Sequence, residues 1–298
     1  MQSGIPDTQY PILVTGASGK TGRAVIRALI AKGASVRALA HRPDPVQAQD
    51  LGAHEIVVGD MLDQAAMKRA TSGARAVYHI CSNMNPDEVA IGQVVIAAAR
   101  SAGIEHLVYH SVLHPQTEAM PHHWKKLRVE EKLFESGLTY TILQPAAYMQ
   151  NVLAYWSQIM EQGVYPVPYA AEARLSMVDL EDVAEVAALV LTGPGHNGAI
   201  YELAGPEALS QVEVAAILSR QLGRRVQAQT VPLDDWERKA RASGMNNYAL
   251  EALLQMFRYY DGFGLCGNSS VLNWLLHRPA TTFSAFIKRT MCQPIPNL

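Results

Sequence analysis

A glycine-rich segment near the N-terminus, LVTGASGKTG at residues 13–22, carries residue types that bind phosphate. Its Gly-Lys-Thr triplet would end an ATP-binding loop of the pattern G-x-x-x-x-G-K-[ST]. That pattern needs a glycine where this chain has Val14, so an ATP-binding loop is excluded. Gly16, Gly19 and Gly22 instead form G-x-x-G-x-x-G between an apolar strand and a helix. This arrangement is typical of a turn that holds a dinucleotide pyrophosphate at a helix N-terminus.

Each glycine of this loop has its own expected role. Gly16 lets the chain turn tightly, Gly19 lets the backbone approach the pyrophosphate, and Gly22 lets the helix pack closely on the strand. The alternative is a glycine-rich turn that only tightens a strand–helix unit. The α/β alternation that follows in the chain favours the dinucleotide. The predicted cofactor contacts here are Gly16, Ala17, Ser18, Gly19, Lys20, Thr21 and Gly22.

Cations follow the second expected strand, where an NAD site usually has a carboxylate. The segment reads VRALAHRPD, with His41 and Arg42 just beyond the strand. The Arg42 guanidinium can bind a ribose 2′-phosphate through two hydrogen bonds, and His41 and Lys20 add positive charge. The alternative is a loop of solvated surface cations. NADP(H) is therefore the expected cofactor, in preference to NAD(H).

Further cofactor contacts are expected where the third and fourth strands end. Asp60 is placed to accept a hydrogen bond from the adenine amino group, and its alternative role is to cap a turn or a helix. The chain after the fourth strand should pass the middle of the cofactor. The contacts predicted in these two stretches are Asp60, Met61, Cys81, Ser82 and Asn83.

The segment HSVLHPQTEAMPHHWKKLRVEEKL, residues 110–133, holds the candidate catalytic groups. If a helix begins at Pro121, His122 and Lys126 share one face, which reproduces the Tyr-x-x-x-Lys spacing of short-chain dehydrogenases with histidine replacing tyrosine. In that scheme Lys126 binds the nicotinamide ribose and Ser111 polarises a substrate carbonyl. A histidine with a pKa near neutrality can donate the proton, and His123 rivals His122 for this role. The alternative is an exposed, basic helix start.

These candidate residues belong to short apolar segments that alternate with helix-length amphipathic ones. Such alternation predicts an α/β fold, a doubly wound parallel sheet of the Rossmann type, with a smaller, mostly helical C-terminal domain. The dinucleotide-binding domain is expected at 1–152, continued by about 176–204, and the smaller domain at 153–175 and 205–298. Residues 151–169 are expected to form a helix and then a loop. Ligands of such sheets bind at the carboxyl ends of the strands.

Composition narrows the class of protein further. The formal net charge of −2 argues against a nucleic-acid partner, which requires a basic face. Cys81, Cys266 and Cys292 lack the spacing of metal ligands, so no metal site and a reducing, cytoplasmic setting are expected. No apolar run approaches the ~20 residues of a membrane-crossing helix, and the first ten residues do not read as a signal peptide.

The sequence resembles the NmrA-like group of atypical short-chain dehydrogenases/reductases. The resemblance rests on VTGASGKTG, HWKKLRVEEKLFESGLTYTILQPAAYMQN, VDLEDVA, LAGPEALSQVEVAAILSRQLG and WLLHRPATTFSAF, which together span most of the chain. It implies an NAD(P)-binding Rossmann domain and a small C-terminal domain, with the substrate cleft between them. It places Lys126 on the family's lysine and Arg42 on its arginine near the 2′-phosphate. The implied substrate contacts are Gln144, Pro145, Tyr148 and Asn151.

Two functions follow from this resemblance. Some members are NAD(P)H-dependent reductases of quinones or related aromatic compounds, and a pocket of aromatic and sulfur-containing side chains would suit such a substrate. Other members lack the catalytic tyrosine and act as NADP-binding redox sensors that bind a regulatory protein partner. We expect this chain to be a reductase of the first kind. Whether it forms a homodimer stays an open alternative. The candidates for the pocket, which could equally be packing residues, are Tyr148, Met149, Trp156, Met160, Tyr165 and Tyr169.

Overall fold

The predicted parallel sheet is present in the computed structural model, which describes residues 10–41 and 52–292. Its strand order is β3-β2-β1-β4-β5-β6-β9, and the registers from β3 through β6 are all parallel. This order confirms the doubly wound α/β fold. The strands are β1 Ile12–Val14, β2 Val36–Ala40, β3 Glu55–Val58, β4 Ala76–His79, β5 His106–His110, β6 Tyr140–Pro145 and β9 Ala199–Leu203.

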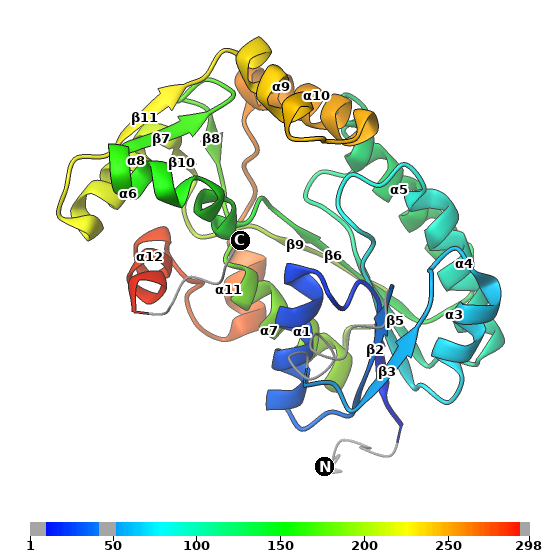
Figure 1. Cartoon of the computed structure of the whole chain (residues 1–298). Coiled ribbons are helices and arrows are strands. Elements are labelled where there is room, and N and C mark those ends of the chain that lie inside the picture. Colours follow the sequence, from blue (N-terminus) through cyan, green and yellow to red (C-terminus); the bar gives the residue numbers. More distant parts are fainter. Residues whose placement is uncertain (1–9, 42–51, 293–298) are drawn as a thin grey trace. The chain divides into compact units, whose positions relative to one another are not determined.

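Helices cover both faces of this sheet, as the apolar strands require. Figure 1 shows α1 (Lys20–Ala31) and α7 (Leu180–Thr192) on one face, and α3 (Gln64–Thr71), α4 (Glu88–Ser101) and α5 (Pro121–Phe134) on the other. The core under the second group joins strand residues to helix residues of α3, α4 and α5, among them Leu13, Val77, Leu107, Ile142, Met67, Ile91, Val95, Val129 and Leu133. Because α5 begins at Pro121, His122 and Lys126 stand one turn apart on it, as predicted.

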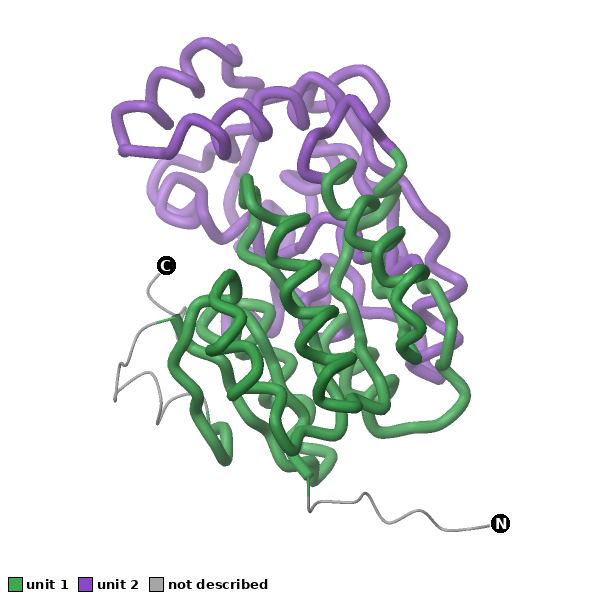
Figure 2. Tube along the Cα trace, turned by 90° about the vertical axis from the view of Figure 1, so that its right-hand side faces the viewer, with its two compact units in different colours: residues 1–116, 123–144, 183–201 green, residues 117–122, 145–182, 202–298 purple. Residues whose placement is uncertain are grey.

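The chain divides into two compact units, which Figure 2 shows in different colours. Unit 1 comprises 1–116, 123–144 and 183–201, and unit 2 comprises 117–122, 145–182 and 202–298. The helices of unit 2 are the 3-10 helix η1 Met149–Tyr155, α6 Trp156–Gln162, α8 Gln211–Leu222, α9 Leu233–Ala242, α10 Asn247–Phe263, α11 Ser270–Leu276 and α12 Phe283–Met291. Its strands are β7 Val164–Val167, β8 Arg174–Leu175, β10 Leu209–Ser210 and β11 Gln227–Thr230.

The strand β7 corrects the expectation of a helix followed by a loop at 151–169. Tyr165 and its neighbours pair in parallel with the polar strand β11, more than sixty positions later. A four-residue strand containing Pro166 gives a weak local signal, because proline is depleted in strands. Its partner decides the structure, so local pattern could not reveal it.

Ion pairs between buried carboxylates and partly exposed arginines tie α12 and the segment before it to the rest of unit 2. The carboxylate of Asp179 is fully buried and lies 2.6 Å from Arg289 on α12, and that of Asp182 lies 2.8 Å from Arg278.

In the described part of the chain, no helix has the length and apolar composition needed to cross a membrane.

Candidate active site

The glycine loop turns from β1 into α1 as its spacing predicts. Gly16 has a φ of +57°, and a Cβ atom there would lie 2.8 Å from the carbonyl oxygen of Ile80. At Gly22 a Cβ atom would lie only 2.3 Å from the carbonyl oxygen of Gly16. The loop therefore lies directly against the first turn of α1 and the end of β4, and both positions require glycine.

The open side of the loop presents the start of α1. Gly19 is the N-cap residue, and the first turn of the helix contains no acidic side chain. The partial positive charge of the helix N-terminus is therefore not offset by a carboxylate of its own first turn. Ser18, Gly19 and Lys20 are exposed there, whereas Ala17 and Thr21 are buried. The predicted contacts thus form one continuous loop suited to an anion.

Thr15 fixes this loop to β4. Its hydroxyl donates to the carbonyl of Ile80 at 3.1 Å and accepts from the Ile80 amide at 3.0 Å. The same hydroxyl lies 2.9 Å from Nδ1 of His79, the last residue of β4. The ends of two neighbouring strands are therefore held in register beside the loop.

The ends of β2 and β3 bring His41 and Asp60 together. Nδ1 of His41 lies 3.7 Å from the Asp60 carboxylate, and both side chains are exposed. Asp60 also accepts from the Leu62 amide at 2.8 Å, which is the turn-capping role proposed as its alternative. Met61 packs against the core of unit 1. Arg42, the predicted 2′-phosphate ligand, lies outside the described residues.

The segment after β4 contains three predicted cofactor contacts, of which one is buried and two are exposed. Burial and the nearby Glu88 carboxylate raise the pKa of Cys81 to about 12, so its thiol stays protonated at neutral pH. Ser82 and Asn83 are exposed, and the hydroxyl of Ser82 accepts from the side chain of Asn85 at 2.9 Å. The Cys81 thiol is therefore a poor nucleophile, and its predicted contact with the cofactor stays a prediction.

Ser111 and Gln144, at the ends of β5 and β6, are joined through Glu130 of α5. The Ser111 hydroxyl donates to the Glu130 carboxylate, and the Gln144 amide donates to it at 3.0 and 3.1 Å. Burial raises the pKa of Glu130, although these hydrogen bonds and the charge of Lys126 act in the opposite direction. In this arrangement the hydroxyl hydrogen of Ser111 points at Glu130, so it is not directed at a substrate carbonyl.

The ammonium group of Lys126 lies at the end of β5 with two hydrogen-bond partners. It is 3.0 Å from the Glu88 carboxylate and donates to the carbonyl of His110 at 3.3 Å. It also stands 5.4 Å from the ring centre of Tyr109. Lys126 is therefore close to the strand ends where the cofactor is expected.

The two histidines proposed as proton donors are both buried. Burial lowers the pKa of His123 to about 4, so its ring is neutral at pH 7, and its Nδ1 lies 3.2 Å from the carbonyl oxygen of His114. A neutral imidazole is a weak acid and a poor proton donor. His122 belongs to unit 2 and is 8% exposed.

Buried neutral histidines should make unit 1 sensitive to acid. Burial lowers the pKa of His79 and His123 to about 4 and that of His110 to about 3, from an ordinary value of 6.5. Between pH 6.5 and 4 the unfolded chain therefore binds protons that the folded chain does not. In this range each histidine lowers the free energy of unfolding by ~1.4 kcal/mol for every unit by which the pH falls. We expect urea unfolding to show this decline, and a His123→Gln variant to show a shallower one.

Two observations would separate this explanation from general acid denaturation. Below pH 6.5 the free energy of unfolding of the His123→Gln variant should fall less steeply with acidification than that of the wild type. Above pH 6.5 the two proteins should show the same pH dependence. Glu88 contributes in a different range, because Lys126 and Tyr109 hold its pKa below 4.5, against the effect of burial. Its contribution is present above pH 4.5 and is lost only in stronger acid. Equal slopes for wild type and variant would contradict the assignment.

The predicted substrate contacts beyond Gln144 belong to unit 2. Pro145 ends β6, Tyr148 precedes η1 and forms an isolated bridge with Val178, and Asn151 is exposed. Two of the aromatic candidates pack within unit 2 itself. The Tyr165 hydroxyl donates to Gln211 at 3.0 Å, and the Tyr169 ring lies 5.6–6.0 Å from the rings of Tyr260 and Phe257. These contacts support the packing alternative for both tyrosines.

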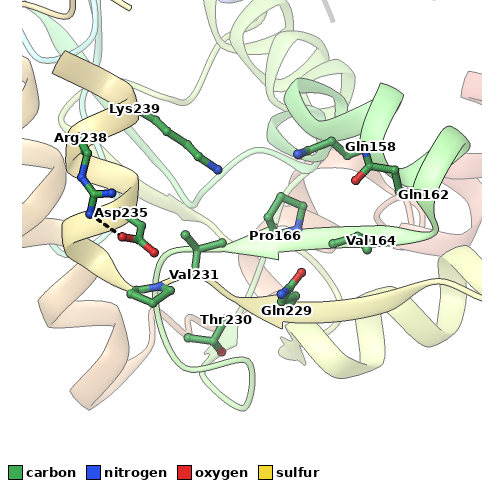
Figure 3. A pocket seen from close by; sticks show the side chains of 11 residues that line it. Gln158, Gln162, Val164, Pro166, Gln229, Thr230, Val231, Asp235, Arg238 and Lys239 are labelled. Atoms are coloured by element: carbon green, nitrogen blue, oxygen red, sulfur yellow. Dashed lines mark hydrogen bonds and ion pairs between the residues drawn. The ribbon is translucent and has the colours of Figure 1, made fainter. Parts of the chain in front are cut away.

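A groove of about 350 Å³ lies within unit 2, and none of the predicted cofactor, catalytic or substrate contacts is among its lining residues. Figure 3 shows its floor formed by β7 and β11, with α6 on one side and α9 on the other. Its lining is largely polar, and Arg238 is paired with Asp235 at 2.6 Å. The lining residues are Gln158, Gln162, Val164, Pro166, Gln229, Thr230, Val231, Pro232, Asp235, Arg238 and Lys239.

Glu88 and Glu130 are the buried carboxylates of the site that the sequence analysis missed. Glu130 had a signal, because it follows Lys126 by four positions and therefore shares its helix face. Glu88 had none, because it reaches Lys126 from a different helix. Among the described residues, no cluster of three or more histidine, cysteine or acidic side chains could hold a metal ion.

Relatives of this chain include named NAD(P)H-dependent enzymes. NAD(P)H azoreductase from Xenophilus azovorans is 31% identical over 281 residues, which are 93% of this chain and 96% of that protein. Quinone oxidoreductase 2 from Escherichia coli is 30% identical over 275 residues, 92% and 96% of the two chains. A crystal structure of the NADPH-dependent quinone oxidoreductase of E. coli with NADPH has a TM-score of 0.83 and 28% identity, covering 94% of this chain and 99% of that one.

A regulator is also among the relatives. The nitrogen metabolite repression protein nmrA of Emericella nidulans is 30% identical over 243 residues, 74% of this chain and 68% of that protein. The cofactor class predicted from the glycine loop agrees with the names of the relatives that are enzymes. Residues 8–287 match the sequence pattern of the NmrA-like family. With its sheet order and its glycine loop, this chain belongs to the NmrA-like family.

Proposed function

We propose that this chain is an NAD(P)H-dependent oxidoreductase that prefers NADPH and reduces a quinone or a similar aromatic acceptor. The observation that carries the proposal is the glycine loop, which requires glycine at Gly16 and Gly22 and opens onto the N-terminus of α1, whose first turn has no acidic side chain. Lys126 lies at the same edge of the sheet, at the end of β5. The names of the azoreductase and the quinone oxidoreductase support the reaction class.

The residues of unit 1 fit a dinucleotide along the strand ends. The α1 N-terminus would hold the pyrophosphate, Lys126 the nicotinamide ribose, and His41 with Arg42 the 2′-phosphate that distinguishes NADPH from NADH. When bound, the nicotinamide supplies a hydride from its C4 atom. The protein's task is then to orient the ring and to keep water away from it.

Two of the candidate acid groups are poorly suited to donate a proton, which favours an acceptor that needs little acid catalysis. His123 is neutral at pH 7, and the hydroxyl of Ser111 is directed at Glu130. A quinone can accept a hydride without a dedicated protein acid, whereas a simple ketone depends on one. This contrast supports a quinone or a related aromatic acceptor over an aliphatic carbonyl.

The runner-up function is a redox sensor that binds NADP(H) without turnover. It is favoured by His122 in place of a catalytic tyrosine and by the regulator among the relatives. Assays of nicotinamide oxidation with NADPH or NADH and a panel of quinones, azo dyes and aromatic aldehydes separate the two. Turnover with a lower KM for NADPH supports the reductase. Tight NADPH binding with no turnover on any acceptor supports the sensor.

A further inference from the structure

Glu88 is a buried carboxylate outside every sequence motif of the site. It is the first residue of α4 and is 3% exposed. Its Oε1 atom accepts from the Tyr109 hydroxyl at 2.8 Å and from the Lys126 ammonium at 3.0 Å. A buried charge is tolerated when it is paired and hydrogen-bonded, and Glu88 meets both conditions.

The contacts of Glu88 determine where the ammonium of Lys126 points. Lysine has a flexible side chain of four methylene groups and a compact charge, so a single helix position does not define the place of its ammonium. Here Glu88 holds it from α4 and the His110 carbonyl from the end of β5. These partners use two of its three hydrogens, which leaves the third for a hydroxyl group of a bound ribose.

We propose that Glu88 is a positioning residue that holds Lys126 in the orientation needed to bind the nicotinamide ribose. The proposal rests on the proposed function, which assigns Lys126 that role. Tyr109 supports the arrangement, because its hydroxyl fixes the same oxygen of Glu88 that faces Lys126. The alternative is that Glu88 competes with the ribose for the ammonium of Lys126. In that case Glu88→Gln would bind NADPH more tightly than the wild type.

The first test measures NADPH affinity by fluorescence titration, which needs no acceptor. Glu88→Gln should weaken NADPH binding about tenfold in the wild-type background. In a Lys126→Met background it should change the dissociation constant less than about twofold, because Glu88 acts through the lysine. Equal effects in both backgrounds, or tighter binding by Glu88→Gln, would overturn the proposal. Glu131→Gln is the matched control, since that exposed carboxylate of α5 pairs with Arg128.

The second test reports the state of Lys126 without any cofactor. The rate of acylation by an amine reagent is followed by peptide mass spectrometry, with Lys125 as the internal reference. Glu88→Gln should accelerate the labelling of Lys126 severalfold and leave that of Lys125 unchanged. Unchanged labelling of Lys126 would show that Glu88 does not hold it. If wild type binds no NADPH, the proposed function fails, and labelling still decides whether Glu88 holds the lysine.

A second variant keeps the test valid if Glu88→Gln does not fold. Tyr109→Phe retains the carboxylate and removes one of its hydrogen bonds. It should shift both NADPH affinity and labelling of Lys126 in the same direction as Glu88→Gln, by a smaller factor. A Tyr109→Phe protein that matches the wild type in both measurements would remove the support assigned to this hydroxyl and contradict the arrangement.

Discussion

A Gly22→Ala variant is expected to bind NADPH about 100-fold more weakly than the wild type, a loss of ~2.7 kcal/mol. The added methyl group would lie 2.3 Å from the carbonyl oxygen of Gly16 and 2.8 Å from the Cα atom of Ala17. Both are backbone atoms of the loop, so the loop must move away from α1. The amide groups that should surround the pyrophosphate then lose their geometry.

A second glycine provides the control for this variant. Gly262 lies near the end of α10, where an added Cβ atom would meet nothing within 4 Å. Gly262→Ala should leave NADPH affinity unchanged and stabilise the protein by ~0.5 kcal/mol, since alanine favours the helix. Circular dichroism and thermal melting must show that the Gly22→Ala protein is folded. If that folded variant bound NADPH as the wild type does, the loop would not be the cofactor site.

A Lys126→Met variant should lose about 100- to 1,000-fold in kcat/KM for quinone reduction. The substitution keeps the length and apolar stem of the side chain and removes the ammonium that should orient the ribose. It also leaves the buried Glu88 carboxylate without its cationic partner, so the pKa of Glu88 should rise. Steady-state oxidation of NADPH at several quinone concentrations gives the loss and divides it between kcat and KM.

The neighbouring lysine provides the matched control. Lys125 is on the same helix, and its ammonium donates to the carbonyl of Pro86 at 2.6 Å. Lys125→Met should retain kcat/KM within about twofold, because exposed contacts of this kind contribute little. Similar losses in both variants would indicate a general effect of charge on α5. A Lys126→Met protein with wild-type turnover would remove the lysine from the mechanism.

The fold and the glycine loop were predictable because their signals are local. Apolar segments of strand length, glycines at helix ends and the spacing of Gly16, Gly19 and Gly22 each occupy a few consecutive residues. The carboxyl ends of parallel strands share one edge of the sheet, so the segments that leave β2, β3, β4 and β5 begin at that edge, and the cofactor contacts predicted there stay predictions. The helix start at Pro121 placed His122 and Lys126 on one face in the same way.

The partners of the site residues were not predictable, because they come from segments far apart in the chain. Glu88 contacts Lys126 across 38 positions, and Gln144 contacts Glu130 from another element. The hydroxyl of Ser111 points at Glu130 for the same reason, although its place after β5 was foreseen. The neutrality of His123 depends on its burial, which the sequence pattern alone does not give.

Transfer of hydride from bound NADPH to a quinone in a single turnover is the decisive test of the proposed reductase activity. Protein mixed with a slight deficit of NADPH is added rapidly to excess 1,4-benzoquinone, and nicotinamide absorbance is followed beside a protein-free control. We expect complete oxidation of the bound cofactor, at a rate that saturates with quinone concentration and is far slower in Lys126→Met. Protein-bound NADPH that stays reduced in the presence of every quinone tried would contradict the proposed activity.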